Sequence, residues 1–148
     1  MRLTTFTDYA LRVLLFVATA PEGRARIAEI ATTYRISEHH LVKVAHHLGK
    51  EGLLANTRGR GGGLRLARPA SEINVGHVVR TAEKPSVLVE CFAPGGHCVI
   101  TGSCRLAGAL QKAHDAFYEV LDGFTLEDLL AHPQRMTRIL HYSMEQRQ

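Results

Sequence analysis

Apolar residues recur every three or four positions along the first fifty residues, which predicts a series of short amphipathic helices. The first helix is expected over Thr4–Thr19, where Thr4, Thr5 or Thr7 can serve as N-cap and Pro21 with Gly23 ends the helix. Its apolar stripe consists of Phe6, Tyr9, Ala10, Val13, Phe16 and Val17. Leu11 and Leu15 fall near the opposite face, so we expect the second half of this helix to be buried on two sides.

Two shorter helices are predicted next, over residues 26–34 and 38–50, joined by a tight turn at residues 34–36. Ser37 stands at the N-cap position of the second helix, and Gly52 ends it. The inward positions are Ile27, Ile30 and Ala31 in one helix and Leu41, Val44, Ala45 and Leu48 in the other. This arrangement is typical of a helix-turn-helix, whose second helix enters the major groove of DNA.

Two short strands, over residues 53–57 and 63–66, flank an Arg-Gly-Arg-Gly-Gly-Gly run that begins at Arg58. Glycines let the backbone turn tightly, and Arg58 and Arg60 can reach phosphates or a narrow minor groove. The run lacks the Gly-Lys-Ser/Thr ending of a nucleotide-binding loop. We therefore predict a winged helix-turn-helix within a mainly α-helical fold that has a small β-wing. The expected DNA contacts are Ser37, Glu38, His39, His40, Lys43, Arg58 and Arg60.

The charge distribution supports a polyanionic partner for the N-terminal half. Residues 1–70 contain eleven Lys or Arg and five Asp or Glu, a net charge of +6, whereas residues 71–148 contain seven and nine, a net charge of −2. A basic half suggests contact with double-stranded DNA, although a solvated basic face would have the same composition. The histidine pairs 39/40 and 46/47 are interpreted as surface or DNA-facing residues, because sequence neighbours on a helix point apart.

The second half is predicted to be helical as well, with a short helix over residues 74–83 and a long one over residues 104–122. The long helix has a heptad-like seam formed by Leu106, Leu110, Ala113, Phe117 and Val120. This seam could pack on its own domain, but we favour pairing with a second copy, because winged helices commonly read two half-sites as symmetric dimers. Short helices over residues 125–131 and 134–142 complete the chain. The expected organisation is a DNA-binding domain at 1–83, a loop at 84–104, and a dimerisation helix with extension at 105–148.

The apolar run Val13–Ala20 is too short to span a membrane, and the charges of Asp8 and Arg12 argue against a signal peptide. We therefore expect a cytoplasmic protein, in which thiols stay reduced.

All three cysteines, Cys91, Cys98 and Cys104, lie in one loop rich in glycine and proline, separated by six and five residues. Thiolates gathered in this way suit zinc or an iron–sulfur centre, and a fourth ligand is missing from the loop. The candidates for that ligand are Glu90, His97, His114 and Asp8, of which His114 lies too far along its helix. A redox-active thiol set and a zinc site completed by His97 remain open alternatives. Asp8 is also four residues before Arg12, a spacing that predicts an ordinary ion pair.

Four stretches of the chain resemble a known family. They are the opening Leu-Thr-x-Phe-Thr-Asp-Tyr-Ala-Leu-Arg (3–12), Ile-Ser-x-x-His-Leu-x-Lys-Val (36–44), the wing at 58–63, and the cysteine loop ending in Cys-Arg-Leu. Together they are similar to the nitric-oxide-sensitive repressors (NsrR), part of a bacterial winged-helix superfamily that also includes the regulator of iron–sulfur cluster assembly. The assembly regulator has a histidine ligand three residues after its third cysteine, where this chain has Ala107.

The resemblance implies a [4Fe–4S] cluster held by Cys91, Cys98, Cys104 and Asp8, with Asp8 coming from the partner subunit of a homodimer. It also implies a repressor rather than an enzyme, which binds a pseudo-palindromic operator and releases it when nitric oxide attacks the cluster, so that nitric oxide detoxification genes are expressed. A [2Fe–2S] or generic redox or iron sensor on the same scaffold is the alternative. A small electron carrier or thiol enzyme is the rival from another class, and it would bind no operator.

Overall fold

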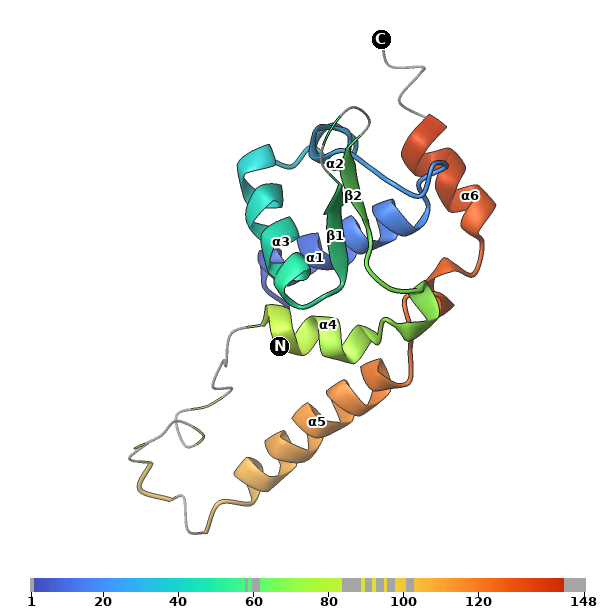
Figure 1. Cartoon of the computed structure of the whole chain (residues 1–148). Helices are drawn as coiled ribbons and strands as arrows, with labels where there is room; N and C mark the ends of the chain where they lie inside the picture. The colour runs from blue at the N-terminus through green and yellow to red at the C-terminus, as the bar shows by residue number, and fades with distance from the viewer. Residues whose placement is uncertain are drawn as a thin grey trace.

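The computed structural model describes residues 2–57, 59, 62–83, 89, 92, 95, 98–100 and 103–142. In this part of the chain the fold is mainly helical with one small sheet, as the sequence predicted (Figure 1). The elements are α1 (Thr5–Ala18), α2 (Ile27–Tyr34), α3 (Glu38–Lys50), β1 (Leu54–Thr57), β2 (Gly63–Leu66), η1 (Ala70–Glu72), α4 (Val75–Ala82), α5 (Arg105–Asp122), η4 (Asp128–Leu130), α6 (Pro133–Thr137) and η5 (Arg138–Tyr142).

The helix α1 forms the centre of the core. It begins after Thr4, whose hydroxyl accepts a hydrogen bond from the backbone N–H of Thr7 at 3.3 Å. α1 packs against α3, α4 and β2, so it is covered on more than one side, as its apolar pattern predicted. Its buried residues are Thr7, Ala10, Val13, Leu14, Phe16 and Val17.

The helices α2 and α3 form the predicted helix-turn-helix. The turn depends on Arg35, which has a left-handed backbone with φ of 55°, and on a hydrogen bond from the N–H of Ile36 to the carbonyl of Ala31. α3 buries Leu41, Val44, Ala45 and Leu48, the face expected from their spacing. The prediction that Ser37 caps α3 is correct in position only, because the Ser37 side chain makes no capping hydrogen bond.

The wing is an antiparallel pair in which Leu54 faces Leu66 and Thr57 faces Gly63. A short bridge between Ala25 and Leu64 attaches this hairpin to the segment before α2, through hydrogen bonds of 2.9 and 2.8 Å. Gly63 is required at this crossing, because a Cβ there would lie 2.8 Å from the carbonyl oxygen of Ala25. The wing is thereby fixed to the helix-turn-helix.

The helix α5 lies along α4 and extends beyond it, so that the N-terminal end of α5 projects away from the rest of the described fold (Figure 1). Its other end is anchored by Arg80 of α4, which donates to both carboxylate oxygens of Asp122 and lies over the ring of Tyr118 at 4.7 Å. α5 contains no buried residue. The apolar seam predicted on α5 is therefore only partly covered by the rest of the described chain.

The segment after α5 returns to the core, where Leu126 and Leu140 are buried. The predicted helix over residues 125–131 is wrong, because only Asp128–Leu130 form a single 3₁₀ turn. The N–H of Leu126 donates to the carbonyl of Ile73 at 2.8 Å, which fixes this stretch against the chain before α4, and Pro133 disfavours helical backbone just before it. The last predicted helix is confirmed as α6 followed by one π-helical turn, η5. No helix in the described ranges is both long enough and apolar enough to cross a membrane.

Candidate nucleic-acid interface and metal ligands

The outer face of α3 is exposed and polar, as a DNA-reading helix requires. Ser37, Glu38, His39, His40 and Lys43 are all exposed, and they occupy the first half of the helix opposite its buried face. In a helix-turn-helix these N-terminal positions contact base edges. The structure therefore places the five predicted α3 contacts where DNA could reach them.

The wing lies beside the same helix. Residues of α3 and β1 line a shallow groove of about 350 Å³, formed by Ala45, His46, Gly49, Lys50, Leu54 and Asn56. Arg58 and Arg60, the predicted wing contacts, lie outside the described residues. Arg65 is exposed on β2 and adds a basic side chain to the wing that sequence reasoning did not select.

Asp8 lies in the first turn of α1 and forms an ion pair with Arg12, whose Nε donates to Oδ1 at 3.0 Å. The Asp8 side chain remains 46% exposed. The i,i+4 pair expected from the spacing is therefore present, and enough of the carboxylate is open to solvent for an additional ligand role.

The neighbours of Asp8 on α1 touch both helices of the helix-turn-helix. The Arg12 guanidinium lies 5.5 Å from the centre of the Tyr34 ring, at the end of α2. The ring of Tyr9 lies 6.4 Å from that of His40 on α3. Burial raises the pKa of the Tyr34 hydroxyl, and the positive charge of Arg12 opposes part of that rise. The first two turns of α1 therefore connect the Asp8 carboxylate with both helices of the helix-turn-helix.

The cysteines are only partly described. Cys98 and Cys104 are half-buried, and Cys104 is the N-cap residue of the 18-residue helix α5. The partial positive charge at a helix N-terminus favours negative charge there, which suits a thiolate ligand. Cys91, Glu90 and His97 lie outside the described residues. Within the described ranges no three Cys, His, Asp or Glu side chains gather closely enough to hold a metal ion.

Glu83 is a connecting residue that the sequence did not reveal. Its Oε1 accepts three hydrogen bonds from the start of α1: from the Thr4 N–H at 2.7 Å, the Thr4 hydroxyl at 3.1 Å and the Thr7 hydroxyl at 2.5 Å. Glu83 is the C-cap residue of α4, and Thr7 directly precedes Asp8. One carboxylate thus joins the end of α4 to the turn that carries Asp8.

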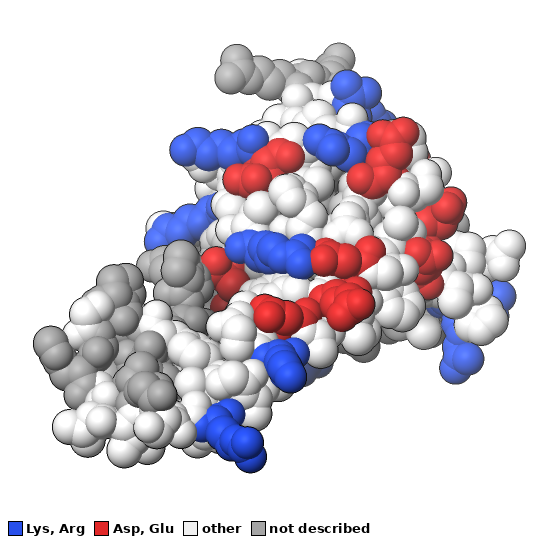
Figure 2. Space-filling model, turned by 90° about the horizontal axis from the view of Figure 1, so that it is seen from below, with Lys and Arg blue, Asp and Glu red and all other residues white. Residues whose placement is uncertain are grey.

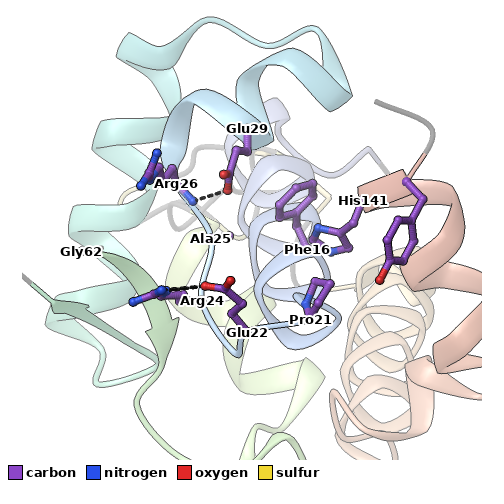
Figure 3. A pocket seen from close by; sticks show the side chains of 10 residues that line it. Phe16, Pro21, Glu22, Arg24, Ala25, Arg26, Glu29, Gly62 and His141 are labelled. Atoms are coloured by element: carbon purple, nitrogen blue, oxygen red, sulfur yellow. Dashed lines mark hydrogen bonds and ion pairs between the residues drawn. The ribbon is translucent and has the colours of Figure 1, made fainter. Parts of the chain in front are cut away.

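A second hollow, of about 480 Å³, lies between the end of α1, the segment before α2, and the C-terminal turn (Figure 3). The His141 ring packs against the Phe16 ring at a tilt of 56°, with centres 4.2 Å apart, and its Nε2 shares a hydrogen bond with the Thr19 hydroxyl at 3.1 Å. Glu22 pairs with Arg24 at 2.6 Å along the segment before α2. Burial lowers the pKa of His141, while a hydrogen bond to the Phe16 backbone and the charge of Glu29 oppose that shift. The hollow marks where the C-terminal segment docks on the core.

The surface around α5 differs from the α3 face. Figure 2 shows the molecule from below, the side on which α5 lies in Figure 1, and acidic side chains gather among basic ones over the middle of this face. Apolar side chains are also exposed along α5, with Leu106 63% and Val120 61% accessible. The described part of this side carries no uniformly basic surface for DNA, but it leaves Leu106 and Val120 of the α5 seam uncovered.

Comparisons with known proteins identify similar chains. Residues 3–132 match the Rrf2 family model, described as an iron-dependent transcriptional regulator. The HTH-type transcriptional regulator NsrR of Geobacillus kaustophilus is 52% identical over 132 residues, covering 88% of this chain and 90% of the relative. NsrR of Oceanobacillus iheyensis is 46% identical and covers 95% and 97%.

Solved structures show the same architecture. CymR, the global cysteine regulator of Bacillus subtilis, superposes with a TM-score of 0.71 at 29% identity and covers 89% of this chain and 98% of its own. IscR of T. potens superposes with a TM-score of 0.69 at 27% identity and covers 88% and 86%.

Proposed function

Because the chain belongs to the NsrR group of the Rrf2 family and is thus a DNA-binding transcription regulator, we propose that it is a repressor that senses nitric oxide through a [4Fe–4S] cluster. In this proposal the cluster-bound protein occupies a pseudo-palindromic operator and releases it after exposure to nitric oxide. Genes for nitric oxide detoxification are the expected targets. The protein has no catalytic role in this scheme.

The DNA is read by α3 in the major groove. The exposed His39 and Lys43 can donate hydrogen bonds or charge to bases and phosphates, and Glu38 can accept from cytosine N4. Arg58 and Arg60 of the wing are proposed to contact the adjacent minor groove or phosphates. The attachment of the wing to Ala25 supports a fixed spacing between these two contact regions.

The proposed ligands are Cys91, Cys98, Cys104 and Asp8, and their chemistry fits a cluster site. Three thiolates are the ligands that iron–sulfur iron prefers, and a carboxylate oxygen is a harder ligand that leaves one iron more reactive. The open Asp8 carboxylate and the position of Cys104 at the start of α5 support this assignment. When bound, the cluster supplies iron that reacts with nitric oxide. The role of this chain is to hold that group and to transmit its presence to α3.

One observation carries the proposal: the Asp8 turn lies directly beside the residues that contact both helix-turn-helix helices. Arg12 pairs with Asp8 and lies over Tyr34 of α2, and Tyr9 packs near His40 of α3. A carboxylate drawn toward a metal would loosen its pairing with Arg12, and Arg12 would then change its position against Tyr34. Ligand occupancy thereby biases the placement of the DNA-reading unit between two arrangements.

We propose that α5 pairs with the same helix of a second copy. Its exposed seam, with Leu106 and Val120 mostly accessible, is an apolar surface that a partner helix would cover. A symmetric dimer also presents two copies of α3 to the two halves of a pseudo-palindromic operator. Asp8 of the partner subunit then completes each cysteine set.

The experiment that tests this function is a cluster count joined to a DNA-binding assay. Anaerobically purified protein should contain about four iron and four sulfide per chain. It should also bind the promoter regions of nitric oxide detoxification genes. Protein with two iron per chain would contradict the [4Fe–4S] assignment and favour the [2Fe–2S] alternative. Protein that carries a cluster but binds no DNA would favour an electron carrier.

A further inference from the structure

Val42 is an apolar side chain on the polar outer face of α3. It is 52% exposed, whereas its neighbours on the same face, Glu38, His39, Lys43 and His46, are charged or polar. Among the described residues up to Glu83, Val42 is the only large apolar side chain in the exposed class. Nothing in the packing of α3, which buries Leu41, Val44, Ala45 and Leu48, accounts for a valine here.

The position of Val42 gives it access to whatever α3 contacts. It lies one helical turn after Glu38 and one turn before His46, so all three share a side of the helix. The same side continues to Ala45 and Gly49, which line the groove between α3 and β1. Val42 therefore stands on the half of the outer face that borders the wing.

A valine in a helix is also stiff. Branching at Cβ leaves one strongly preferred χ1 rotamer, so its methyl groups keep one direction and lose little freedom on contact. Such a side chain suits shape recognition of a small apolar group. It can offer no hydrogen bond to a polar base edge.

The major groove of DNA presents one apolar group among the four standard bases, the 5-methyl of thymine. We propose that Val42 is a specificity-determining residue that packs on a thymine methyl in each half-site. This inference rests on the proposed entry of α3 into the major groove, and it adds a named residue and a named base to that role. Isolated apolar residues also occur on protein surfaces without function, so the test must separate these two cases.

The test uses deoxyuridine, which differs from thymidine only by lacking that methyl group. Duplexes enriched by the protein from a random-sequence pool serve as probes, and each thymine is replaced in turn by deoxyuridine. For wild type, one thymine per half-site should show an affinity loss of about fourfold on replacement, the value of one buried methyl group. Val42→Ala should bind the thymine duplex about 15-fold more weakly, because both half-sites lose the contact, and it should show no further loss with deoxyuridine at that position.

The matched control is the adjacent Lys43→Ala, whose side chain is exposed on the same face. It should weaken binding to thymine and deoxyuridine duplexes by the same factor. Thermal melting of both variants checks that the fold is intact.

Two results would overturn the inference. One is a wild-type protein indifferent to deoxyuridine at every thymine, and the other is Val42→Ala retaining the full wild-type sensitivity. In both cases the protein still binds the duplexes, so the result rules out the Val42 contact but not the proposed entry of α3 into the major groove. A protein that enriches no duplex at all overturns both the inference and that role.

Discussion

At the scale of single residues, the ion pair of Asp8 with Arg12 competes with the proposed role of Asp8 as a cluster ligand. Its ion pair with Arg12 is half-exposed, and exposed pairs of this i,i+4 kind contribute only about 0.3–0.5 kcal/mol to stability. A bond so weak can be given up for a stronger ligand without unfolding α1. The structure therefore allows Asp8 to serve as a stabilising side chain in one state and as a cluster ligand in another.

Asp8→Ala should remove the ligand role while leaving the fold intact. We expect lower iron retention and an altered visible absorption spectrum, with a change in the free energy of unfolding of the metal-free protein below about 0.5 kcal/mol. Arg12→Ala is the matched control, because it breaks the same ion pair but keeps the carboxylate. Glu90→Ala should also retain the cluster. A normal spectrum and iron content in Asp8→Ala would disprove the assignment.

His141 provides a pH-dependent contact at the same scale. Burial lowers its pKa in the folded protein, so the protonated form is disfavoured there relative to the unfolded chain. The contribution of His141 to the free energy of unfolding is therefore fully present above its unfolded pKa of about 6.5. It is lost as the pH falls from that value through the lower pKa of the folded protein. The negative charge of Glu29 favours the protonated ring and so makes the pKa difference between the folded and unfolded states smaller.

We expect the free energy of unfolding to fall between pH 7.5 and pH 5.5 more steeply in wild type than in His141→Gln. Urea unfolding at several pH values measures this difference. His132→Gln is the control, because His132 is exposed on the surface. Parallel pH profiles for wild type and His141→Gln would rule out the titration of His141 as the cause.

At the scale of elements, α1 is held at its start by α4. Glu83 accepts the Thr4 N–H and the hydroxyls of Thr4 and Thr7, so the orientation of the Asp8 turn depends on the end of another helix. The chain leaves Glu83 toward the cysteine loop. This joint therefore fixes the start of α1 to the end of α4.

Glu83→Ala should destabilise the protein by about 1–2 kcal/mol, the usual cost of losing hydrogen bonds to a charged group that is partly exposed. Glu83→Gln should recover part of that loss, because its amide oxygen can still accept hydrogen bonds. Denaturant unfolding of the metal-free protein measures both variants, with the exposed Glu72→Ala as control. Equal stability of Glu83→Ala and Glu72→Ala would show that the joint contributes nothing.

Local features could be predicted from the sequence at this scale, and long-range contacts could not. The buried face of α3 and the tight turn before it follow from spacing over a few residues, and the structure confirms both. The hydrogen bond between Glu83 and Thr4 joins residues 79 positions apart in the sequence, and no local sequence pattern predicts it. The failed helix at 125–131 has the same origin, because that stretch is fixed by the backbone of Ile73.

Part of the candidate site could be predicted from the sequence, because the pattern of apolar residues shows which side chains of α3 are exposed. The exposed positions on α3 follow from its buried face, and the same argument would have placed Val42 among them. The approach of Arg12 to Tyr34 depends on how α1 crosses α2, which the sequence alone does not specify. The ligand role of Asp8 came from resemblance to a family, and it stays a prediction.

At the scale of the whole molecule, two functions occupy opposite parts of the chain. The basic N-terminal half, with a net charge of +6 over residues 1–70, carries the winged helix. The other half carries the cysteines and the exposed seam of α5. In the proposed dimer, Asp8 of one copy joins the cysteines of the other. The central claim is that the state of this shared site controls DNA affinity.

The most direct test measures DNA affinity before and after nitric oxide in one anaerobic preparation. Fluorescence anisotropy with a labelled duplex, enriched by the protein itself, reports the Kd while absorption follows the cluster. We expect the Kd to rise by about 5–150-fold as nitric oxide consumes the cluster, the usual range for coupled sites. An unchanged Kd after complete loss of the cluster absorption would contradict the account.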